Sequence, residues 1–351
     1  MNNNEILTLD PKESRRAFKS SVSRCHFSTA IYLLVASILV VAVQTVLALV
    51  LGDQYEAIMD SPVYSHYIVW GMQVLCMYIL AFPLFHTLTK HLPRWDKSDK
   101  ENLPFGQFIG IFFATQGIML VGSIVANMIN ESITEYFGII VEDTTSDLIV
   151  NSPMWMVILV VVIIGPIFEE LIFRKIYIDT IGKYNSRLAI FISGASFALF
   201  HGNITQAIYT FGAGILLAWI YTKTKRIIYP ILIHMLINFF GSIPSMLIMD
   251  SVNRVGSMTE EELMAGVSDP TIAMDIIKVA LVSMMQYGFI IIGVIALFVM
   301  LVRGQFRIRR DGELKIPFLY NLKILVFNRG TLFFLIFSIL NIIGNLFLLG
   351  M

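Results

Sequence analysis

Three short polar motifs stand inside apolar stretches of this sequence, and their residue types are those of hydrolytic chemistry. They are Glu169-Glu170-x-x-x-Arg174, Phe197-x-x-x-His201 and His234-x-x-x-Asn238. Residues four apart on a helix lie on one face, so each motif is expected to project its polar groups in one direction. A carboxylate can take a proton from water, a histidine can position that water, and fixed donors can stabilise an oxyanion.

The two adjacent carboxylates are expected to have different surroundings. Glu170 and Arg174 are four residues apart, with the acid before the base, whereas Glu169 points about 100° away on a helix. Arginine can then neutralise one acid while the other faces a different neighbour, which separates their protonation behaviour. The alternative is that both acids only mark the cytoplasmic end of a membrane span.

The two histidine motifs have plainer alternatives as well. His201 could simply hydrogen-bond a backbone carbonyl of a neighbouring helix, and the His234–Asn238 pair could hold two helices together. All three motifs nevertheless fall within 70 residues that otherwise carry few charges inside the predicted membrane. Polar clusters at membrane depth are costly and usually functional, so the set favours a site.

Other hydrolytic signatures are absent from the sequence. It contains no HExxH zinc-protease helix and no GxGD motif, and Gly194-Ala195-Ser196-Phe197 lacks the second glycine of a GxSG serine site. The two cysteines, Cys25 and Cys76, have no CxxC context and no histidine placed by a motif to activate them. Water activated by glutamate and histidine is the chemistry that remains.

The elements that must position these motifs are predicted to be membrane spans. Hydrophobic residues make up 56% of the 351 residues and charged residues 14%, and the mean hydropathy is +0.75. A span needs about 20 apolar residues to cross a hydrocarbon core of roughly 30 Å. The sequence predicts an all-α, polytopic transmembrane helical bundle of eight to nine spans, with candidates at 27–51, 65–87, 105–129, 154–173 (continuing to 181), 188–203, 204–222, 229–249, 276–302 and 331–350.

The charges indicate the orientation of the chain. Of the 25 Lys and Arg residues, 23 fall in the first 26 residues or in the alternate segments 88–104, 174–187, 223–226 and 303–330. Cations collect in cytoplasmic loops, so we expect a cytoplasmic amino terminus, an uncleaved first span and a bacterial plasma (inner) membrane. The basic face suits anionic lipid, so the lipid bilayer is an expected partner and nucleic acid is not.

The expected organisation is one helical bundle in four parts. These are a cytoplasmic tail (1–26), amino-terminal transmembrane helices (27–153), a catalytic transmembrane core (154–245), and a carboxy-terminal loop with transmembrane helices (246–351). Within the last part, Thr259–Gly266 is predicted to form a short amphipathic helix or a solvated cap.

The three motifs, in this order on three spans, resemble the CPBP family of intramembrane proteases. That family includes the type II CAAX prenyl endopeptidases and Abi-type proteins linked to bacteriocin processing and self-immunity. The resemblance covers about 90 of the 351 residues, and all three motifs are intact.

The resemblance implies a role for each motif residue. Glu169 is the general base and His201 its partner on the attacking water, while His234 and Asn238 stabilise the oxyanion. Glu170, Arg174 and Phe197 are supporting residues, and Arg174 is also a candidate for binding a substrate carboxylate. The cofactor stays open between none and a catalytic zinc ion held by Glu169, His201 and His234; asparagine is a poor zinc ligand, which favours the metal-free mechanism.

The predicted function is therefore that of an intramembrane endopeptidase, a hydrolase cutting a membrane-associated peptide or protein near the cytoplasmic side. Expected substrates are peptides such as bacteriocin or pheromone precursors, with lipidated proteins fitting less well. The alternatives are a non-catalytic bacteriocin immunity or scaffolding protein and a proton-coupled transporter. Proton transport predicts acids spread across the bilayer, whereas Glu169 and Glu170 lie at one depth.

Overall fold

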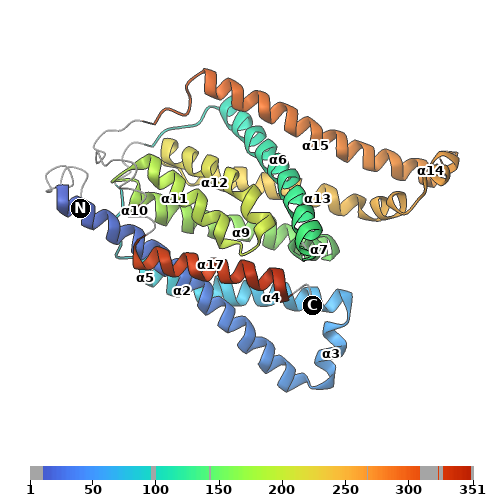
Figure 1. Cartoon of the computed structure of the whole chain (residues 1–351), viewed down its shortest axis with the longest axis horizontal. Helices are drawn as coiled ribbons and strands as arrows, with labels where there is room; N and C mark the ends of the chain where they lie inside the picture. The colour runs from blue at the N-terminus through green and yellow to red at the C-terminus, as the bar shows by residue number, and fades with distance from the viewer. Residues whose placement is uncertain are drawn as a thin grey trace.

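The chain folds into helices throughout the part that the computed structural model describes, which is residues 11–95, 100–141, 144–266, 268–308, 323 and 327–348 (Figure 1). Segments labelled η are π-helical turns within longer helices. In chain order the elements are α2 (Pro11–Leu51), α3 (Asp53–Met59), α4 (Pro62–Gln73), η1 (Val74–Ala81), α5 (Phe82–Thr89), α6 (Phe105–Phe137), α7 (Thr144–Asn151), α8 (Met154–Met156), η2 (Val157–Ile164), α9 (Gly165–Glu170), η3 (Leu171–Ile178), α10 (Asp179–Ile181), α11 (Ser186–Phe200), α12 (Ile204–Thr224), α13 (Ile228–Gly256), α14 (Glu260–Gly266), α15 (Pro270–Val302) and α17 (Arg329–Leu348).

Seven of these helical stretches are long and apolar enough to cross a membrane. They are Lys12–Leu51, Tyr64–Thr89, Phe105–Phe137, Met154–Ile181, Ile204–Thr224, Ile228–Gly256 and Pro270–Val302. The predicted polytopic helical bundle is confirmed. The predicted fifth and ninth spans correspond to the two shorter apolar helices, Ser186–Phe200 and Arg329–Asn345, so the predicted number of spans fits only roughly.

The first helix extends well beyond the predicted span 27–51. Residues 11–26, expected as part of a tail, continue α2 without a break. Phe18, Val22 and Cys25 are buried against the bundle, with relative exposures of 1%, 0% and 0%. This apolar face explains why the segment is helical and docked; residues 1–10 lie outside the described part of the chain.

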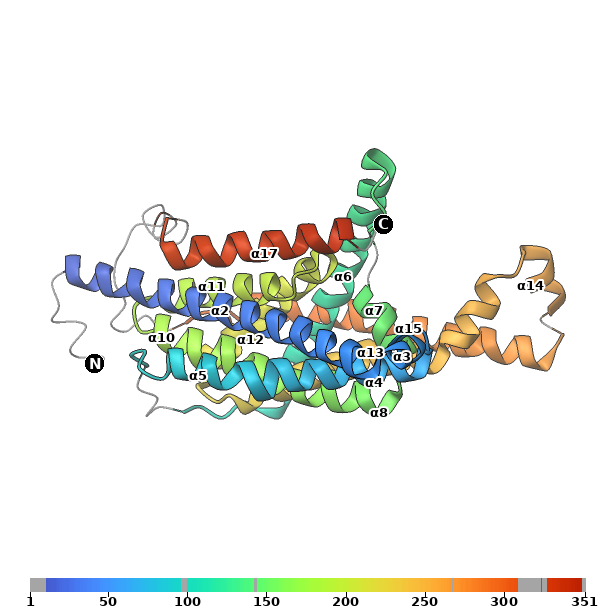
Figure 2. The ribbon, with the colours of Figure 1, turned by 90° about the horizontal axis from the view of Figure 1, so that it is seen from below.

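The helices form three layers around α11 and α12. Figure 1 shows α9, α11 and α12 in the middle, α6 and α15 on one side, and α2, α5 and α17 on the other. Figure 2 confirms that α17, at the end of the sequence, runs alongside α2 near its beginning. The middle layer, which carries the two glutamates and the Phe197–His201 motif, is therefore flanked by helices from both ends of the chain.

Small residues let α6 and α15 approach closely. A Cβ added to Gly117 of α6 would stand 3.0 Å from the Cα of Gly293 on α15. Small residues at such crossings allow backbones to pack directly, which is a major source of helix association in membranes.

Short polar side chains mark the starts of helices that follow turns. Asn185 accepts a hydrogen bond from the Leu188 N–H at the start of α11, and Asp269 accepts one from the Thr271 N–H at the start of α15. Such caps satisfy backbone donors that have no partner within the helix.

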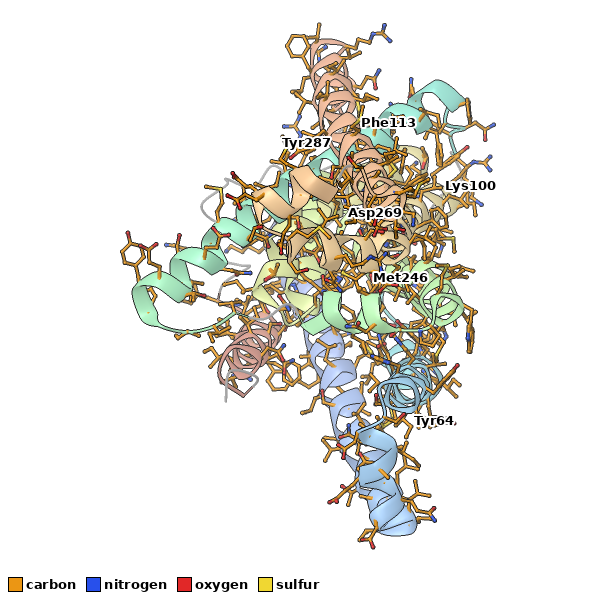
Figure 3. All side chains as sticks on the ribbon, turned by 90° about the vertical axis from the view of Figure 1, so that its right-hand side faces the viewer. Tyr64, Lys100, Phe113, Met246, Asp269 and Tyr287 are labelled. Carbon is orange, nitrogen blue, oxygen red and sulfur yellow. The ribbon has the colours of Figure 1, made fainter. Side chains whose placement is uncertain are left out.

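The predicted loop 250–275 is largely helical. Helix α13 continues to Gly256, α14 occupies Glu260–Gly266, and α15 begins at Pro270, so the predicted short helix at 259–266 is present. Figure 1 places α14 at the end of the molecule away from the amino terminus, and Figure 3 looks onto this end, where Asp269 and Tyr64 are labelled.

Candidate active site

A π-helical turn shapes the helix that carries the glutamates. In this turn the Gly165 N–H reaches the Val160 carbonyl, five residues back. With the same five-residue spacing, the N–H of residue 166 would donate to the Val161 carbonyl. Residue 166 is proline, which has no N–H. The Asn238 side-chain amide donates to the Val161 carbonyl instead, at 2.8 Å, and so fastens α13 to this turn.

Glu170 is the buried centre of an ionic cluster. Its carboxylate lies 2.9 Å from Nε of Arg174 and 2.9 Å from Nδ1 of His234. The side chains of Glu170 and Arg174 have no solvent exposure, so each needs the other to offset the cost of burial. The predicted Glu170–Arg174 pair is present, and the burial of Arg174 leaves it no exposed surface for a substrate carboxylate.

Glu169 points to a different environment, as its position on the helix predicts. Its side chain is 18% exposed, and its Oε2 lies 3.7 Å from Nε2 of His234. His234 therefore lies between the two carboxylates, with Nδ1 committed to Glu170. Because an ionised carboxylate only accepts, this contact places a proton on Nδ1; the neutral ring then presents an unprotonated Nε2 to Glu169, and the protonated ring can donate to both acids.

His201 joins the same cluster from the end of α11. Its Nδ1 lies 2.8 Å from the Phe197 carbonyl, which can only accept, so Nδ1 carries the proton and Nε2 is the free nitrogen of the neutral ring. His201 interacts electrostatically with both Glu169 and His234. A nitrogen in this tautomer can accept a proton from a water molecule.

Phe197 holds both histidines and the arginine. Its ring makes edge-to-face contacts with His201 and His234, at centroid distances of 5.0 and 5.6 Å. The Arg174 guanidinium stacks over the same ring at 4.8 Å. Phe197 thus sets the spacing of the polar groups without adding a polar group itself, which accounts for an aromatic residue one turn before His201.

The turn after His201 is held by the last described helix. Gly202 adopts a left-handed conformation with φ 64, and Asn203 caps α12 by accepting from the Thr205 and Gln206 N–H groups. Asn345 of α17 donates a hydrogen bond to the Gly202 carbonyl at 2.6 Å. A residue 143 positions further along the chain therefore fixes the backbone next to His201.

A metal ion has no preformed ligand set among the described residues. No group of three His, Cys, Asp or Glu side chains in that part of the chain is arranged to hold one. In the set Glu169, His201 and His234, the Nδ1 of His234 is committed to Glu170 and its Nε2 remains, which is also how a metal-ligating histidine is usually held. The cofactor therefore stays open between none and a zinc ion, and no step below is assigned to a metal.

Two further residues near Glu169, Tyr78 and Tyr32, were not singled out in the sequence. The Tyr78 hydroxyl and the Glu169 Oε1 lie 3.5 and 3.7 Å from the point where a Cβ on Gly165 would stand. Tyr32 interacts electrostatically with both Tyr78 and Glu169. Pro166 within an apolar helical run is a local signal for the distorted turn, but no local signal in the sequence brings Tyr32 or Tyr78 to this place.

The fold and the cluster define a membrane-embedded helical protein with a partly exposed glutamate and two histidines between its helices. The family model described as type II CAAX prenyl endopeptidase Rce1-like matches residues 151–240, the segment that contains all three motifs. The predicted resemblance is thereby confirmed for this segment, which is about a quarter of the chain.

Two bacterial relatives are similar to the chain. One is a putative membrane peptidase, YdiL, of Bacillus subtilis (strain 168), 34% identical over 177 residues, which are 48% of this chain and 66% of that protein. The other is the membrane-embedded CAAX protease MroQ of Staphylococcus aureus (strain USA300), 38% identical over 85 residues, 22% of this chain and 34% of that protein. The chain therefore covers less than two thirds of the length of each relative, and no solved structure matches it.

Proposed function

We propose that this integral membrane protein is an intramembrane endopeptidase that hydrolyses a peptide bond with water activated by Glu169 and His201. The observation that carries the proposal is that the two adjacent glutamates differ in burial and in ionic partner. Glu170 is fully buried and neutralised by Arg174, whereas Glu169 is partly exposed next to His234. An uncompensated carboxylate beside an imidazole is the arrangement that general-base catalysis needs. The names of the two relatives, a membrane peptidase and a CAAX protease, support the same reaction class.

The reaction balances with the groups present. Glu169 takes one proton from a water molecule that His201 Nε2 orients, and the water oxygen bonds to the carbonyl carbon of the peptide. The carbonyl π electrons move to oxygen, giving a tetrahedral oxyanion. When the C–N bond breaks, the proton passes to the departing nitrogen, leaving a carboxylic acid and an amine.

The supporting residues keep these groups in place. Glu170 and Arg174 orient His234, and Phe197 spaces both histidines. In this proposal His234 and Asn238 face the oxyanion, His234 with the Nε2–H of its protonated ring and Asn238 with the second hydrogen of the amide that already donates to Val161.

The substrate is a peptide or protein that reaches the site from the membrane. We place the chain in a bacterial plasma membrane with its amino terminus cytoplasmic, because Lys and Arg gather in alternate connecting segments. Glu169 follows the apolar segment 154–164 and precedes the basic segment 174–187, which favours cleavage near the cytoplasmic side.

The test is cleavage of a pooled-peptide substrate by purified wild type, Glu169→Ala and His201→Ala, each with and without a chelator. We expect cleavage by wild type only, unaffected by the chelator. Chelator-sensitive cleavage would contradict the metal-free mechanism. Cleavage by all three proteins, or by none while the mutants retain a cellular phenotype, would contradict the proposed catalysis and favour a binding or immunity role.

A further inference from the structure

Both expected oxyanion donors have other commitments. The Asn238 amide donates to the Val161 carbonyl at 2.8 Å, and His234 Nδ1 donates to Glu170 at 2.9 Å. The remaining nitrogen of His234 faces the Glu169 carboxylate. Donors aimed at the developing charge usually contribute the largest share of catalysis, so any further donor near Glu169 bears directly on the reaction.

Tyr78 of η1 brings a hydroxyl to the same side of Gly165 as the Glu169 carboxylate. The Tyr78 oxygen and the Glu169 Oε1 both approach the space above Gly165, 3.5 and 3.7 Å from the position of a Cβ at that residue. The Tyr78 side chain is 8% exposed. Gln73 also hydrogen-bonds this hydroxyl, and a phenol oxygen can accept from an amide while its own O–H donates elsewhere.

Tyr32 of α2 supplies a second hydroxyl, and this one is uncommitted. The residue has no solvent exposure, and its hydroxyl is buried without a hydrogen-bond partner among the described residues. It interacts electrostatically with Tyr78 and Glu169. A buried hydroxyl without a partner is costly, and in native proteins it calls for an explanation such as a ligand or catalytic role.

The Tyr32 and Tyr78 rings stack on the phenylalanines that directly precede His201 and Glu169 in the sequence. Tyr32 stacks on Phe200, which precedes His201, at a centroid distance of 6.1 Å and an interplanar angle of 3°. Tyr78 stacks on Phe168, which precedes Glu169, at 4.6 Å and 27°. Each phenol is thus held rigidly relative to one of the two groups that activate water.

We propose that Tyr32 and Tyr78 are catalytic residues whose hydroxyls donate hydrogen bonds to the scissile carbonyl oxygen as it becomes the oxyanion. This inference rests on the proposed endopeptidase function and adds donors to it. The phenols keep their protons throughout, so the atoms and electrons of the reaction balance as before. The hydrogen bonds strengthen as negative charge develops and therefore act on the transition state more than on bound substrate.

The first measurement compares the steady-state kinetics of Tyr32→Phe and Tyr78→Phe on a peptide that wild type cleaves. Loss of an oxyanion donor is expected to lower kcat by about 10²–10³-fold with little change in KM. The matched control is Tyr221→Phe, which removes a buried hydroxyl bonded to Asp179. Thermal unfolding of all four proteins separates lost catalysis from lost folding. Tyr32→Phe and Tyr78→Phe enzymes as active as the control would overturn the proposal.

The second measurement needs no substrate. With 3-fluorotyrosine placed at position 32, the fluorine resonance is compared between the otherwise wild-type protein and the Glu169→Gln variant. A shift on removing the Glu169 charge supports the placement of this hydroxyl beside the carboxylate, whereas an unchanged resonance overturns it. If wild type cleaves no peptide, the proposed function falls on the first measurement, while this one still decides whether Tyr32 belongs to the Glu169 cluster.

Discussion

The Glu170–Arg174 pair and the Arg254–Asp275 pair contain the same kinds of charges, but the first is buried at both ends and the second only at Asp275, which is 4% exposed. Glu170 and Arg174 are separated by 2.9 Å and have no exposed side-chain surface. Arg254 and Asp275 are separated by 2.7 Å, but Arg254 is 52% exposed, and Asp275 has additional partners in Ser251 and Lys278. The first pair lies at the candidate site, and the second joins α13 to α15 near α14.

The difference shows what burial does to an ion pair. Where water can reach a charge, it replaces a lost partner at little cost, so an exposed pair contributes little. Where water cannot, removing one partner leaves a charge that nothing compensates. The Glu170–Arg174 pair must therefore stay complete, and it keeps the Glu170 carboxylate in place as the acceptor for His234.

Arg174→Met is expected to have the largest effect. It leaves the Glu170 carboxylate buried with only His234 as a partner, so stability should fall by about 3–5 kcal/mol and activity should fall with it. Thermal unfolding in detergent, together with peptide cleavage, measures both effects. The control is Lys175→Met, at a side chain that is 40% exposed.

A second variant tests whether the lost charge, rather than the changed shape, causes this loss of stability. In Glu170→Gln/Arg174→Met no buried charge remains, and the glutamine oxygen can still accept from His234, so much of the stability should return. A double variant as unstable as Arg174→Met alone would contradict the electrostatic explanation.

Asn238→Leu is expected to have the next largest effect on stability and activity. It removes the only side-chain donor that the structure gives the Val161 carbonyl, which already lacks a backbone donor because residue 166 is proline. This carbonyl is partly buried, so leaving it unsatisfied should cost stability, up to about 1–3 kcal/mol, and activity should fall as well. Thermal unfolding and cleavage rates check the two effects.

Pro166→Ala separates the two roles of Asn238. Alanine restores an N–H that can reach the Val161 carbonyl in the π-helical register, so Asn238→Leu/Pro166→Ala should regain stability. Activity should stay low if Asn238 also faces the oxyanion. Full recovery of activity would show that the amide only supports the turn.

Lys183→Met tests a buried charge without an ionic partner. Burial lowers the pKa of Lys183 from 10.5 to about 8, and its Nζ has no hydrogen-bond partner among the described residues. Below about pH 8 the ammonium is charged in both states and its burial cost is complete; between about pH 8 and 10.5 the folded state loses the proton first and the cost fades. The substitution should therefore raise Tm at pH 7, and the gain should shrink above pH 8.

The control for Lys183→Met is Lys90→Met at an exposed position, which should leave Tm nearly unchanged at every pH. A gain that stays constant up to pH 9.5 would point to better apolar packing by methionine instead of relief of a buried charge.

Arg254→Gln is expected to have the smallest effect. Water can solvate the exposed end of this pair, and Asp275 keeps Ser251 and Lys278 as partners. Cleavage activity and Tm should both stay close to those of wild type. A large loss of activity would show that the α13–α15 connection is coupled to the site, and the contrast between the two ion pairs would have to be revised.

Local sequence was sufficient to predict contacts within single motifs. The four-residue spacing within each motif corresponds to the Glu170–Arg174 pair and the Phe197–His201 contact in the structure. It was not sufficient for the Asn238–Val161 contact or for the Asn345–Gly202 contact, because each joins segments far apart in the chain. The roles assigned to Glu169, His201, His234 and Asn238 stay predictions.

The sequence by itself determined that this is a helical membrane protein with polar groups at three defined places, because hydropathy, charge asymmetry and helical spacing are local properties. Only the tertiary structure decided which groups share one cluster and which other residues border it. Tyr32 lies near Glu169 because α2 packs against the middle layer, and His201 is fixed because α17 returns alongside α2. Those contacts depend on how whole helices pack, which no short stretch of sequence encodes.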